Sequence, residues 1–221
     1  ASFAVVGRFP TPVTRLALFH FPTAERPDGQ SESIRALRAF DVRGRETSIE
    51  YSGDGSWKSE QPIARISYRV VANHDQVRWG PGKNEVATRF DRTWFFVGNA
   101  FFVIDPAYAA PVRVRFKLPT GWRVTAPWAR EGDYWIAANA DRLQQNAFAL
   151  GLDAPLRIDV DGVAITLLVD SRLGRSSAKL QELLRALPAL YARKRPLPQK
   201  FSSASAMMLR AEFPVHRKST L

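Results

Sequence analysis

Apolar and polar residues alternate along several stretches of the first 170 residues. In residues 112–118, Val, Phe and Leu alternate with Arg and Lys, the period-two pattern of a strand with one buried and one solvated face. Residues 66–71 form a second predicted strand. A third, rich in aromatic residues, covers 94–96 and is expected to resume at 101–104, because Gly98-Asn99 favours a hairpin or a bulge between the two parts.

The strongest turn signal lies near the end of this region. Residues 156–160 and 163–169 are two strand-like stretches, and Asp161 and Gly162 separate them. Asp-Gly in this position is typical of a tight β-hairpin. Loop sequences rich in Gly, Pro, Ser and Asp occupy residues 27–31, 52–56 and 80–84. The spacing predicts a mainly β fold, an antiparallel β-sandwich.

The periodicity changes after Ser171. Leucines then recur at intervals of three and four residues, at Leu180, Leu183, Leu184, Leu187 and Leu190. We expect an amphipathic helix over residues 177–193, kinked or ended early by Pro188. Its leucine stripe must be buried, either against the β region or against a further domain. The sequence thus predicts a C-terminal helical extension.

Charge is unevenly distributed along the chain. The formal net charge is +11, and residues 172–221 hold eleven Lys and Arg against Glu182 and Glu212. We therefore expect two parts, a nearly neutral sandwich at 1–171 and a basic helical segment and tail at 172–221. The basic part is either an arm for nucleic acid or an anionic surface, or a solvated or docking face. The second is favoured, because the Arg-rich stretch carries only Tyr191 as a platform for stacking bases.

Composition argues against a metal or thiol centre in this chain. There is no cysteine, and the three histidines, His20, His74 and His216, lie far apart in the sequence. Neither thiolates nor imidazoles can therefore form a zinc site, and no cofactor is expected within the chain. His20 alternates with apolar neighbours, which favours a strand position, and His74 falls in a predicted loop.

Other catalytic motifs are also missing from the sequence. It contains no HExxH, no Gly-x-Ser-x-Gly and no phosphate loop, and Asp159 and Asp161 fit a hairpin better than a calcium loop. No apolar run approaches the ~18 residues of a transmembrane helix, so we expect a soluble chain. A chain without cysteine can be exported to the periplasm or cytoplasmic, and the sequence does not decide between them.

The order of several segments is more informative than any single motif. It comprises residues 34–44, Trp57, residues 66–70, residues 101–103 and the Pro-x-Gly-Trp-x-Val element at 119–124, followed by residues 134–143 and Gly151. This order resembles the N-terminal domain of the glycyl-aminopeptidase-type zinc metallopeptidases, which are gluzincins that often carry a PDZ module. The resemblance extends over roughly residues 15–190.

The resemblance implies a β-sandwich that precedes a thermolysin-like catalytic domain and forms one wall of the peptide cleft. His216, Arg217, Ser219 and Thr220 match a family segment just upstream of HExxH, which implies a substrate-binding role for them. In such exopeptidases an acidic residue can hold the α-amine of the substrate. The resemblance aligns that residue with Val215, so the acid is replaced by valine here. Zinc is then expected only in a longer parent containing HExxH, beyond residue 221.

We therefore expect a non-catalytic N-terminal portion of a metallo-aminopeptidase-like protein, acting as substrate-cleft wall or scaffold. Zinc-dependent peptide hydrolysis needs a ligand set and a general base that this chain lacks. The expected partners are a peptide substrate or a following catalytic domain, whereas nucleic acid is not favoured. The alternative is a basic binding module that uses residues 172–221 on nucleic acid or anionic surfaces.

Overall fold

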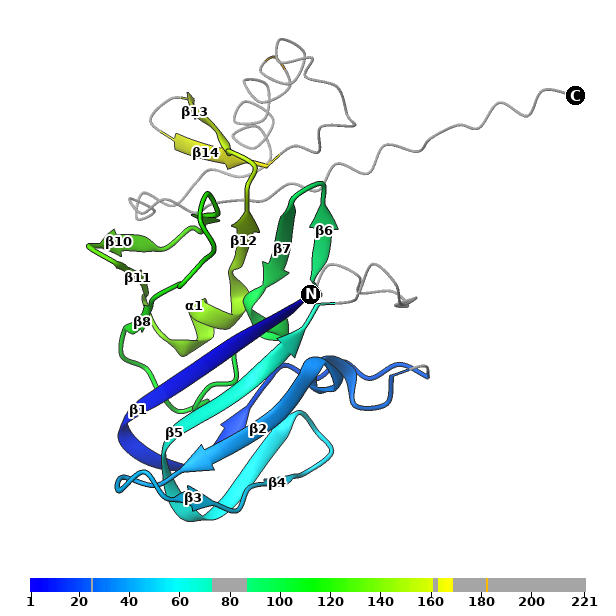
Figure 1. Ribbon diagram of the computed structural model, residues 1–221, viewed down its shortest axis with the longest axis vertical. Coiled ribbons are helices and arrows are strands. Elements are labelled where there is room, and N and C mark those ends of the chain that lie inside the picture. The colour runs from blue at the N-terminus through cyan, green and yellow to red at the C-terminus, as the bar shows by residue number, and fades with distance from the viewer. Residues whose placement is uncertain (25, 73–86, 161–162, 169–181, 183–221) are drawn as a thin grey trace, which may run out of the picture. The chain divides into compact units, whose positions relative to one another are not determined.

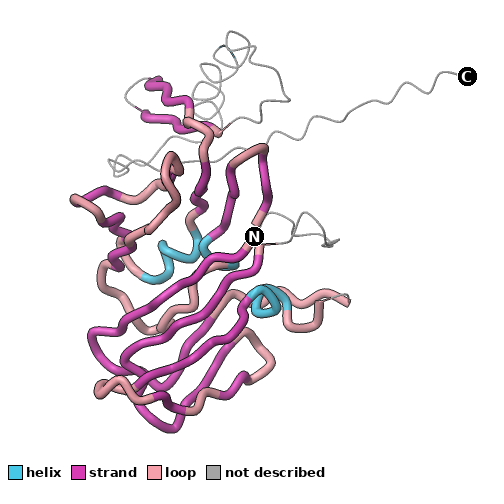
Figure 2. Tube along the Cα trace, in the orientation of Figure 1, coloured by secondary structure: helices cyan, strands magenta, loops and turns pink. Residues whose placement is uncertain are grey.

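The computed structural model describes residues 1–24, 26–72, 87–160, 163–168 and 182. The chain divides into two compact units, Ala1–Asp153 and Ala154–Leu221. Strands make up most of the described residues (Figures 1 and 2). The boundary at 171 expected from charge stays a prediction.

The first sheet is built on two long strands. Its members are β1 (Ser2–Ala17), β5 (Ser56–Val71), β2 (Ile34–Phe40), β3 (Glu46–Thr47) and β4 (Glu50–Tyr51). They lie in the order β1-β5-β2-β3, with β4 beside β5, and every pairing is antiparallel. Figure 1 shows β1, β5 and β2 side by side. One face is buried, since Ile66, Tyr68 and Val70 alternate along β5 with more exposed residues.

Two smaller sheets complete the unit. The strands of one sheet lie in the order β6 (Thr88–Phe90), β7 (Thr93–Val97), β12 (Ala147–Gly151) and β9 (Arg123–Thr125). The strands of the other lie in the order β10 (Ala129–Glu131), β11 (Tyr134–Ala137) and β8 (Val112–Val114). A short helix, α1 (Ala140–Gln145), leads into β12, and the Asn139 side chain caps it by accepting from the Arg142 N–H at 2.8 Å. These pairings are also antiparallel.

A cluster of aromatic rings forms the core between the sheets. Phe148 of β12 is fully buried and contacts Phe96, Phe101, Phe102, Phe116 and Trp128, at ring-centroid distances of 5.1 to 5.8 Å. Phe3 of β1 reaches the same cluster through Phe96, with centroids 5.0 Å apart. The first sheet and the β7–β12 sheet therefore share one apolar core, in the manner of a sandwich.

One buried polar contact also joins the first sheet to this core. The Tyr68 hydroxyl donates to the Phe101 carbonyl at 3.1 Å and accepts from the Val103 N–H at 3.0 Å. Burial raises the pKa of the Tyr68 hydroxyl, against a smaller lowering by the Val103 N–H. The tyrosine thus stays neutral and satisfies two backbone groups that have no partner in a strand ladder.

The mainly β, antiparallel fold expected from the sequence is confirmed. Predicted strands at 66–71 and 94–96 lie within β5 and β7. In the second unit, β13 (Leu156–Val160) pairs antiparallel with β14 (Val163–Leu167), and Val160 lies opposite Val163. This register leaves the two-residue connection that the sequence predicts, although residues 161–162 themselves are outside the described chain.

The predicted hairpin or bulge at Gly98-Asn99 is wrong. Gly98–Ala100 is a short 3-10 helix, η3, which carries the chain out of β7 toward α1. The Gly98 carbonyl accepts from the N–H groups of Phe101 and Phe102 at 3.0 and 2.8 Å. Residues 101–103 are consequently buried coil, and the expected second part of the strand is reduced to a bridge between Ile104 and Ala17.

Three further local expectations need correction. Residues 112–118 keep their alternating exposure, but only Val112–Val114 are paired, because β11 offers three partners. The loop expected at 27–31 includes part of a 3-10 helix, η1 (Gly29–Ser33). His20 follows the end of β1 instead of belonging to a strand.

Several expectations concern residues outside the described chain. These are the helix at 177–193, of which only Glu182 is described and is helical, its leucine stripe, the loop at 80–84 and His74. The C-terminal helical extension stays a prediction for the same reason. Within the described segments, no helix has the length and apolarity that crossing a bilayer requires.

Candidate functional site

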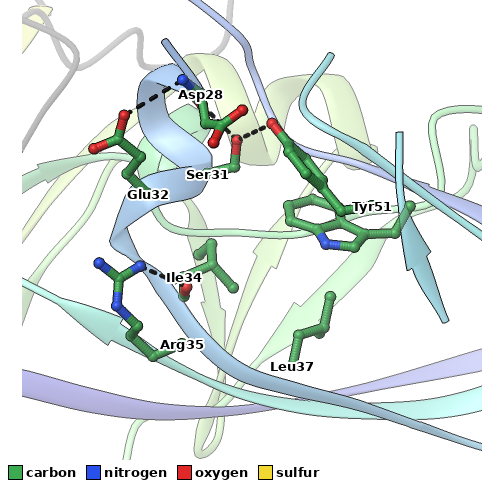
Figure 3. Close-up of a pocket in the computed structure, with 8 residues that line it drawn as sticks. Asp28, Ser31, Glu32, Ile34, Arg35, Leu37 and Tyr51 are labelled. Carbon is green, nitrogen blue, oxygen red and sulfur yellow. Dashed lines mark hydrogen bonds between the residues drawn. The ribbon is translucent and has the colours of Figure 1, made fainter. Parts of the chain in front are cut away.

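A hollow lies beside η1, where the start of β2 meets β4 and β5 (Figure 3). Its volume is about 240 Å³, and it is lined by Asp28, Ser31, Glu32, Ile34, Arg35, Leu37, Tyr51 and Trp57. The lining combines two carboxylates, two hydroxyls and a guanidinium with three large apolar side chains. Convergent polar groups beside apolar surface make this hollow a candidate binding site.

The backbone of η1 is held in place by its own sequence. Gly29 has φ +54°, and a Cβ at this position would lie 2.8 Å from the Phe21 carbonyl oxygen, so the turn requires glycine. The side chain of Gln30 is buried, and its Oε1 accepts from the Phe21 N–H at 2.9 Å. Ser33 donates from its hydroxyl to the Gln30 carbonyl at 2.9 Å. The polar wall of the hollow is therefore preorganised.

A directed chain of hydrogen bonds ties η1 to the β4–β5 turn. The Gly55 N–H donates to the Tyr51 hydroxyl at 3.2 Å, and the Ser31 hydroxyl donates to the Asp28 carbonyl at 2.5 Å. Ser31 and Tyr51 oxygens lie 2.7 Å apart. Because the single hydroxyl hydrogen of Ser31 is already used, Tyr51 is the donor in this contact. Both hydroxyls are thereby oriented.

The apolar side of the hollow depends on an irregularity in β2. The register with β5 shifts between Arg35 and Arg38, and Ala36 takes the left-handed φ of +50°. This bulge turns Leu37 to the inner side of the sheet, where it lines the hollow, and Arg35 borders the hollow from the other side of the bulge. Opposite them, the Tyr51 and Trp57 rings pack with centroids 5.2 Å apart.

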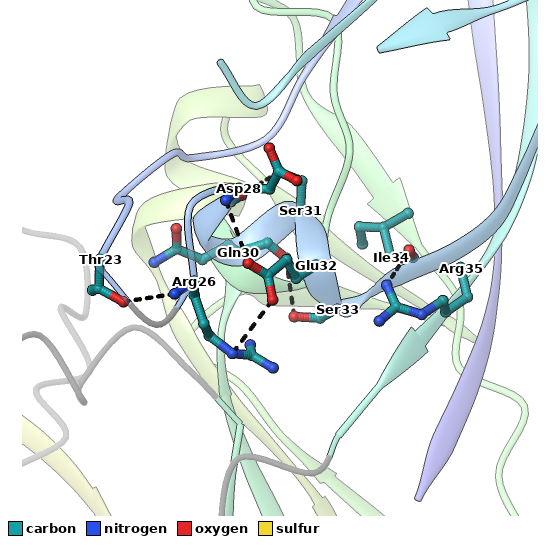
Figure 4. Close-up of polar contacts among 9 residues, drawn as sticks. All are labelled: Thr23, Arg26, Asp28, Gln30, Ser31, Glu32, Ser33, Ile34 and Arg35. Carbon is teal, nitrogen blue, oxygen red and sulfur yellow. Dashed lines mark hydrogen bonds and ion pairs between the residues drawn. The ribbon is translucent and has the colours of Figure 1, made fainter. Parts of the chain in front are cut away.

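The charged side chains around η1 interact with one another (Figure 4). The Arg26 Nε lies 3.6 Å from a Glu32 carboxylate oxygen, and the other Glu32 oxygen accepts from the Asp28 N–H at 3.3 Å. Burial lowers the pKa of Arg26, the Glu32 charge opposes this, and Arg35 adds a smaller lowering. Arg26 and the Asp28 N–H thus fix the position of the Glu32 side chain at the rim of the hollow.

These groups favour binding over catalysis. The Ser31 hydroxyl contacts a tyrosine hydroxyl and a backbone carbonyl, neither of which is a base that could activate a nucleophile. Among the described residues, no three His, Cys, Asp or Glu side chains are grouped so that they could hold a metal ion. The donor set of a zinc centre is therefore not present in the described part of the chain.

Replacing Tyr51 with phenylalanine is expected to lower the free energy of unfolding by about 1–2 kcal/mol. The change leaves the Gly55 N–H without its acceptor and the Ser31 oxygen without its donor, in a partly buried site. Urea denaturation measures the loss. Tyr134→Phe is the matched control, since that hydroxyl has no hydrogen-bond partner among the described residues. Equal losses in both variants would show that the hydrogen-bond chain contributes nothing.

The hollow was not predicted from the sequence. The residues singled out there as substrate-binding, His216, Arg217, Ser219 and Thr220, lie outside the described chain. The lining comes instead from residues 28–37, Tyr51 and Trp57, which are brought together by the pairing of β2 and β4 with β5. The available signal was the dense run of polar residues at 28–33, part of which falls in the loop predicted at 27–31.

Comparison with known proteins agrees with this architecture. Residues 26–158 match the model of the Peptidase M61 N-terminal domain family. A solved structure described as an aminopeptidase N family protein from Idiomarina loihiensis superposes with a TM-score of 0.58 at 16% identity, covering 86% of this chain and 34% of that chain. The fold is therefore shared, and this chain spans about a third of its neighbour's length. No curated protein matches the chain.

The resemblance to a gluzincin-type N-terminal domain, expected from the segment order, is thus confirmed. The matched residues extend over more than half of the chain and include η1, β2, β4 and β5, which line the hollow, as well as the strands around Phe148. The chain belongs to the Peptidase M61 N-terminal domain family.

Proposed function

We propose that this chain is the non-catalytic, N-terminal portion of a metallo-aminopeptidase-like protein, where it forms a wall of the substrate cleft and a scaffold for a following catalytic domain. The family match over residues 26–158 carries this proposal, because that family is defined as the N-terminal domain of a peptidase. The share of the solved neighbour that the chain covers, 34%, supports the same view.

The hollow beside η1 is the part of this wall that we assign to the polypeptide. Ile34, Leu37 and Trp57 supply apolar surface for a side chain. The carboxylates of Asp28 and Glu32, the latter held by Arg26 and the Asp28 N–H, supply acceptors for main-chain N–H groups. Arg35 borders the hollow, where its Nη1 donates to the Ile34 carbonyl at 3.0 Å, and its remaining N–H groups are donors for a carbonyl or carboxylate. A short extended peptide offers all of these groups together.

The zinc chemistry of such a protein would come from elsewhere. A HExxH motif in a longer parent would hold the metal, and by resemblance His216, Arg217, Ser219 and Thr220 would approach the substrate at the start of that catalytic domain. The described residues would then contribute binding and orientation of the peptide. When a peptidase loses a surface that positions its substrate, its catalytic rate falls even though the reacting groups are unchanged.

Two measurements on the full 221-residue chain test this function. Fluorogenic glycyl and leucyl amides, with and without added zinc, are expected to show no turnover. A neutral, capped pentapeptide of alanine and leucine is expected to shift the backbone amide NMR signals of Ser31, Glu32 and Tyr51. Leu37→Thr should weaken this binding about five-fold through lost apolar contact, whereas Val42→Thr, on a side chain that is 72% exposed, should not.

Two other outcomes would contradict the proposed function. Hydrolysis that is proportional to protein concentration and persists through repurification would show a catalytic centre in this chain. Peptide-induced shifts that avoid η1, or that Leu37→Thr and Val42→Thr change alike, would remove the assignment of the hollow to the polypeptide.

A further inference from the structure

The outer face of the first sheet carries an array of arginines. The strand registers align nine outward positions in three rows: Arg8, Arg65 and Phe40; Val6, Ser67 and Arg38; Ala4, Arg69 and Arg35. The opposite face of the same strands is the buried one, so these nine side chains lie on the side away from the core. Five of the nine positions are arginine, and none is lysine or an acid.

Four of these arginines are exposed, and the fifth is supported by packing. Arg8, Arg35, Arg38 and Arg69 are exposed, whereas Arg65 is half-buried with its guanidinium 3.7 Å from the centroid of the Phe40 ring. Arg38 approaches the same ring at 5.3 Å. Contact with the Phe40 ring, which is only 8% exposed, thus holds the guanidinium groups of Arg65 and Arg38 in place.

The arrangement concentrates like charges. Arg8 lies directly opposite Arg65, and Arg69 directly opposite Arg35, and like charges in this relation destabilise a sheet. Among the described residues, the ion pairs within this array involve Arg38 alone, with Glu46 of β3. Two like-charge pairs thus remain on one face, which is the electrostatic signature of a surface that binds anions.

One carboxylate of the chain already binds to the array. Arg38 holds the Glu46 carboxylate through two donors, with its Nε 2.9 Å from one oxygen, the forked geometry that guanidinium and carboxylate share. Phe40 is covered, so the face offers no ring on which a base could stack. Val6 is its only exposed large apolar side chain, too little for anchoring in a membrane.

We propose that this arginine face binds an acidic polypeptide segment of a partner protein through its carboxylates. Side chains on one face of an extended segment repeat every ~7 Å, the same repeat as the rows of the array, because both follow strand geometry. An acidic strand can therefore present successive carboxylates to successive rows. The face is separate from the peptide hollow, except that Arg35 borders both.

The test uses the full chain and a position-specific signal, since the basic residues of 172–221 also attract acidic peptides. A spin-labelled hexaglutamate is expected to broaden the backbone amide NMR signals of Val6 and Ser67 in a saturable way, and a spin-labelled hexaglutamine is not. In the double variant Arg8→Gln/Arg69→Gln, the affinity read from these two signals should fall about five-fold, as expected for two exposed ion pairs. Arg35 is left unchanged, so that the hollow keeps its lining.

The matched control is Arg123→Gln/Arg130→Gln, which removes the same charge from exposed positions in β9 and β10. It should leave the affinity at Val6 and Ser67 unchanged. Equal weakening in the two double variants would reduce the effect to net charge and overturn the proposal. So would broadening confined to signals outside the first sheet, or stronger broadening of Val6 and Ser67 by a DNA duplex than by hexaglutamate. Neutral-peptide binding at Ser31 and Glu32 is scored separately, so either proposal can fail alone.

Discussion

Replacing Phe148 with alanine is expected to lower the free energy of unfolding of the Ala1–Asp153 unit by about 3–5 kcal/mol. The ring is fully buried and lies at the centre of five other aromatic rings, stacked on Phe96 at 5.2 Å and edge-on to Phe101 at 5.1 Å. Its removal forfeits the transfer free energy of the ring and leaves a cavity that rigid neighbours cannot fill. Urea denaturation followed by tryptophan fluorescence gives the change.

Phe19→Ala is the control for this measurement. Phe19 is 36% exposed, so the same chemical change should cost about 1 kcal/mol or less. A loss for Phe148→Ala no larger than that for Phe19→Ala would mean that the aromatic cluster does not hold the sheets together. The inference that the first sheet and the β7–β12 sheet share one core would then be wrong.

Replacing Gly98 with alanine is expected to destabilise the protein by about 3 kcal/mol or more. A Cβ at this position would lie 1.9 Å from the Leu143 carbonyl oxygen of α1 and 2.9 Å from its carbon. Both are backbone atoms, so α1 or η3 must move as a whole, and overpacking of this kind is costly. The Gly98 N–H also donates to the Asn146 carbonyl at 2.9 Å, which holds the two segments together.

Gly53→Ala separates this steric effect from backbone strain. Gly53 has φ +83°, but nothing lies within 4 Å of its Cβ position, so only the left-handed conformation is penalised, by about 1–2 kcal/mol. Thermal or urea unfolding of both variants makes the comparison. If Gly98→Ala is the milder change, α1 and η3 are not in the close contact described.

These two sites also bear on the proposed role. The Phe148 cluster and the Gly98 contact make Ala1–Asp153 one unit, and the hollow and the arginine face are both carried by its first sheet. A cleft wall must hold peptide-contacting groups in fixed positions, because small displacements are costly for orientation. Variants that loosen the core should therefore weaken peptide binding without touching η1.

Local patterns in the sequence determined much of the strand structure. Alternation over residues 66–71 and the aromatic run at 94–96 correctly located parts of β5 and β7, since one buried face imposes a period of two. Asp161 and Gly162 predicted the β13–β14 pairing, because a two-residue turn sets the register of its own strands. The family followed from collinear segments, which record many such local constraints together.

Other features depended on contacts between distant residues. Gly98-Asn99 has the composition of a turn, yet Gly98 is needed because the Leu143 carbonyl, 45 positions away, approaches it. The hollow needs the β2 bulge and the Tyr51–Ser31 hydrogen bond, and the arginine face needs β1, β5 and β2 in one register. The alternation of residues within one strand does not specify which strands become neighbours. Strand pairing is decided by the burial of apolar side chains over the whole sheet. The sequence alone therefore determined the class and the family, and only the tertiary structure decided where its polar groups meet.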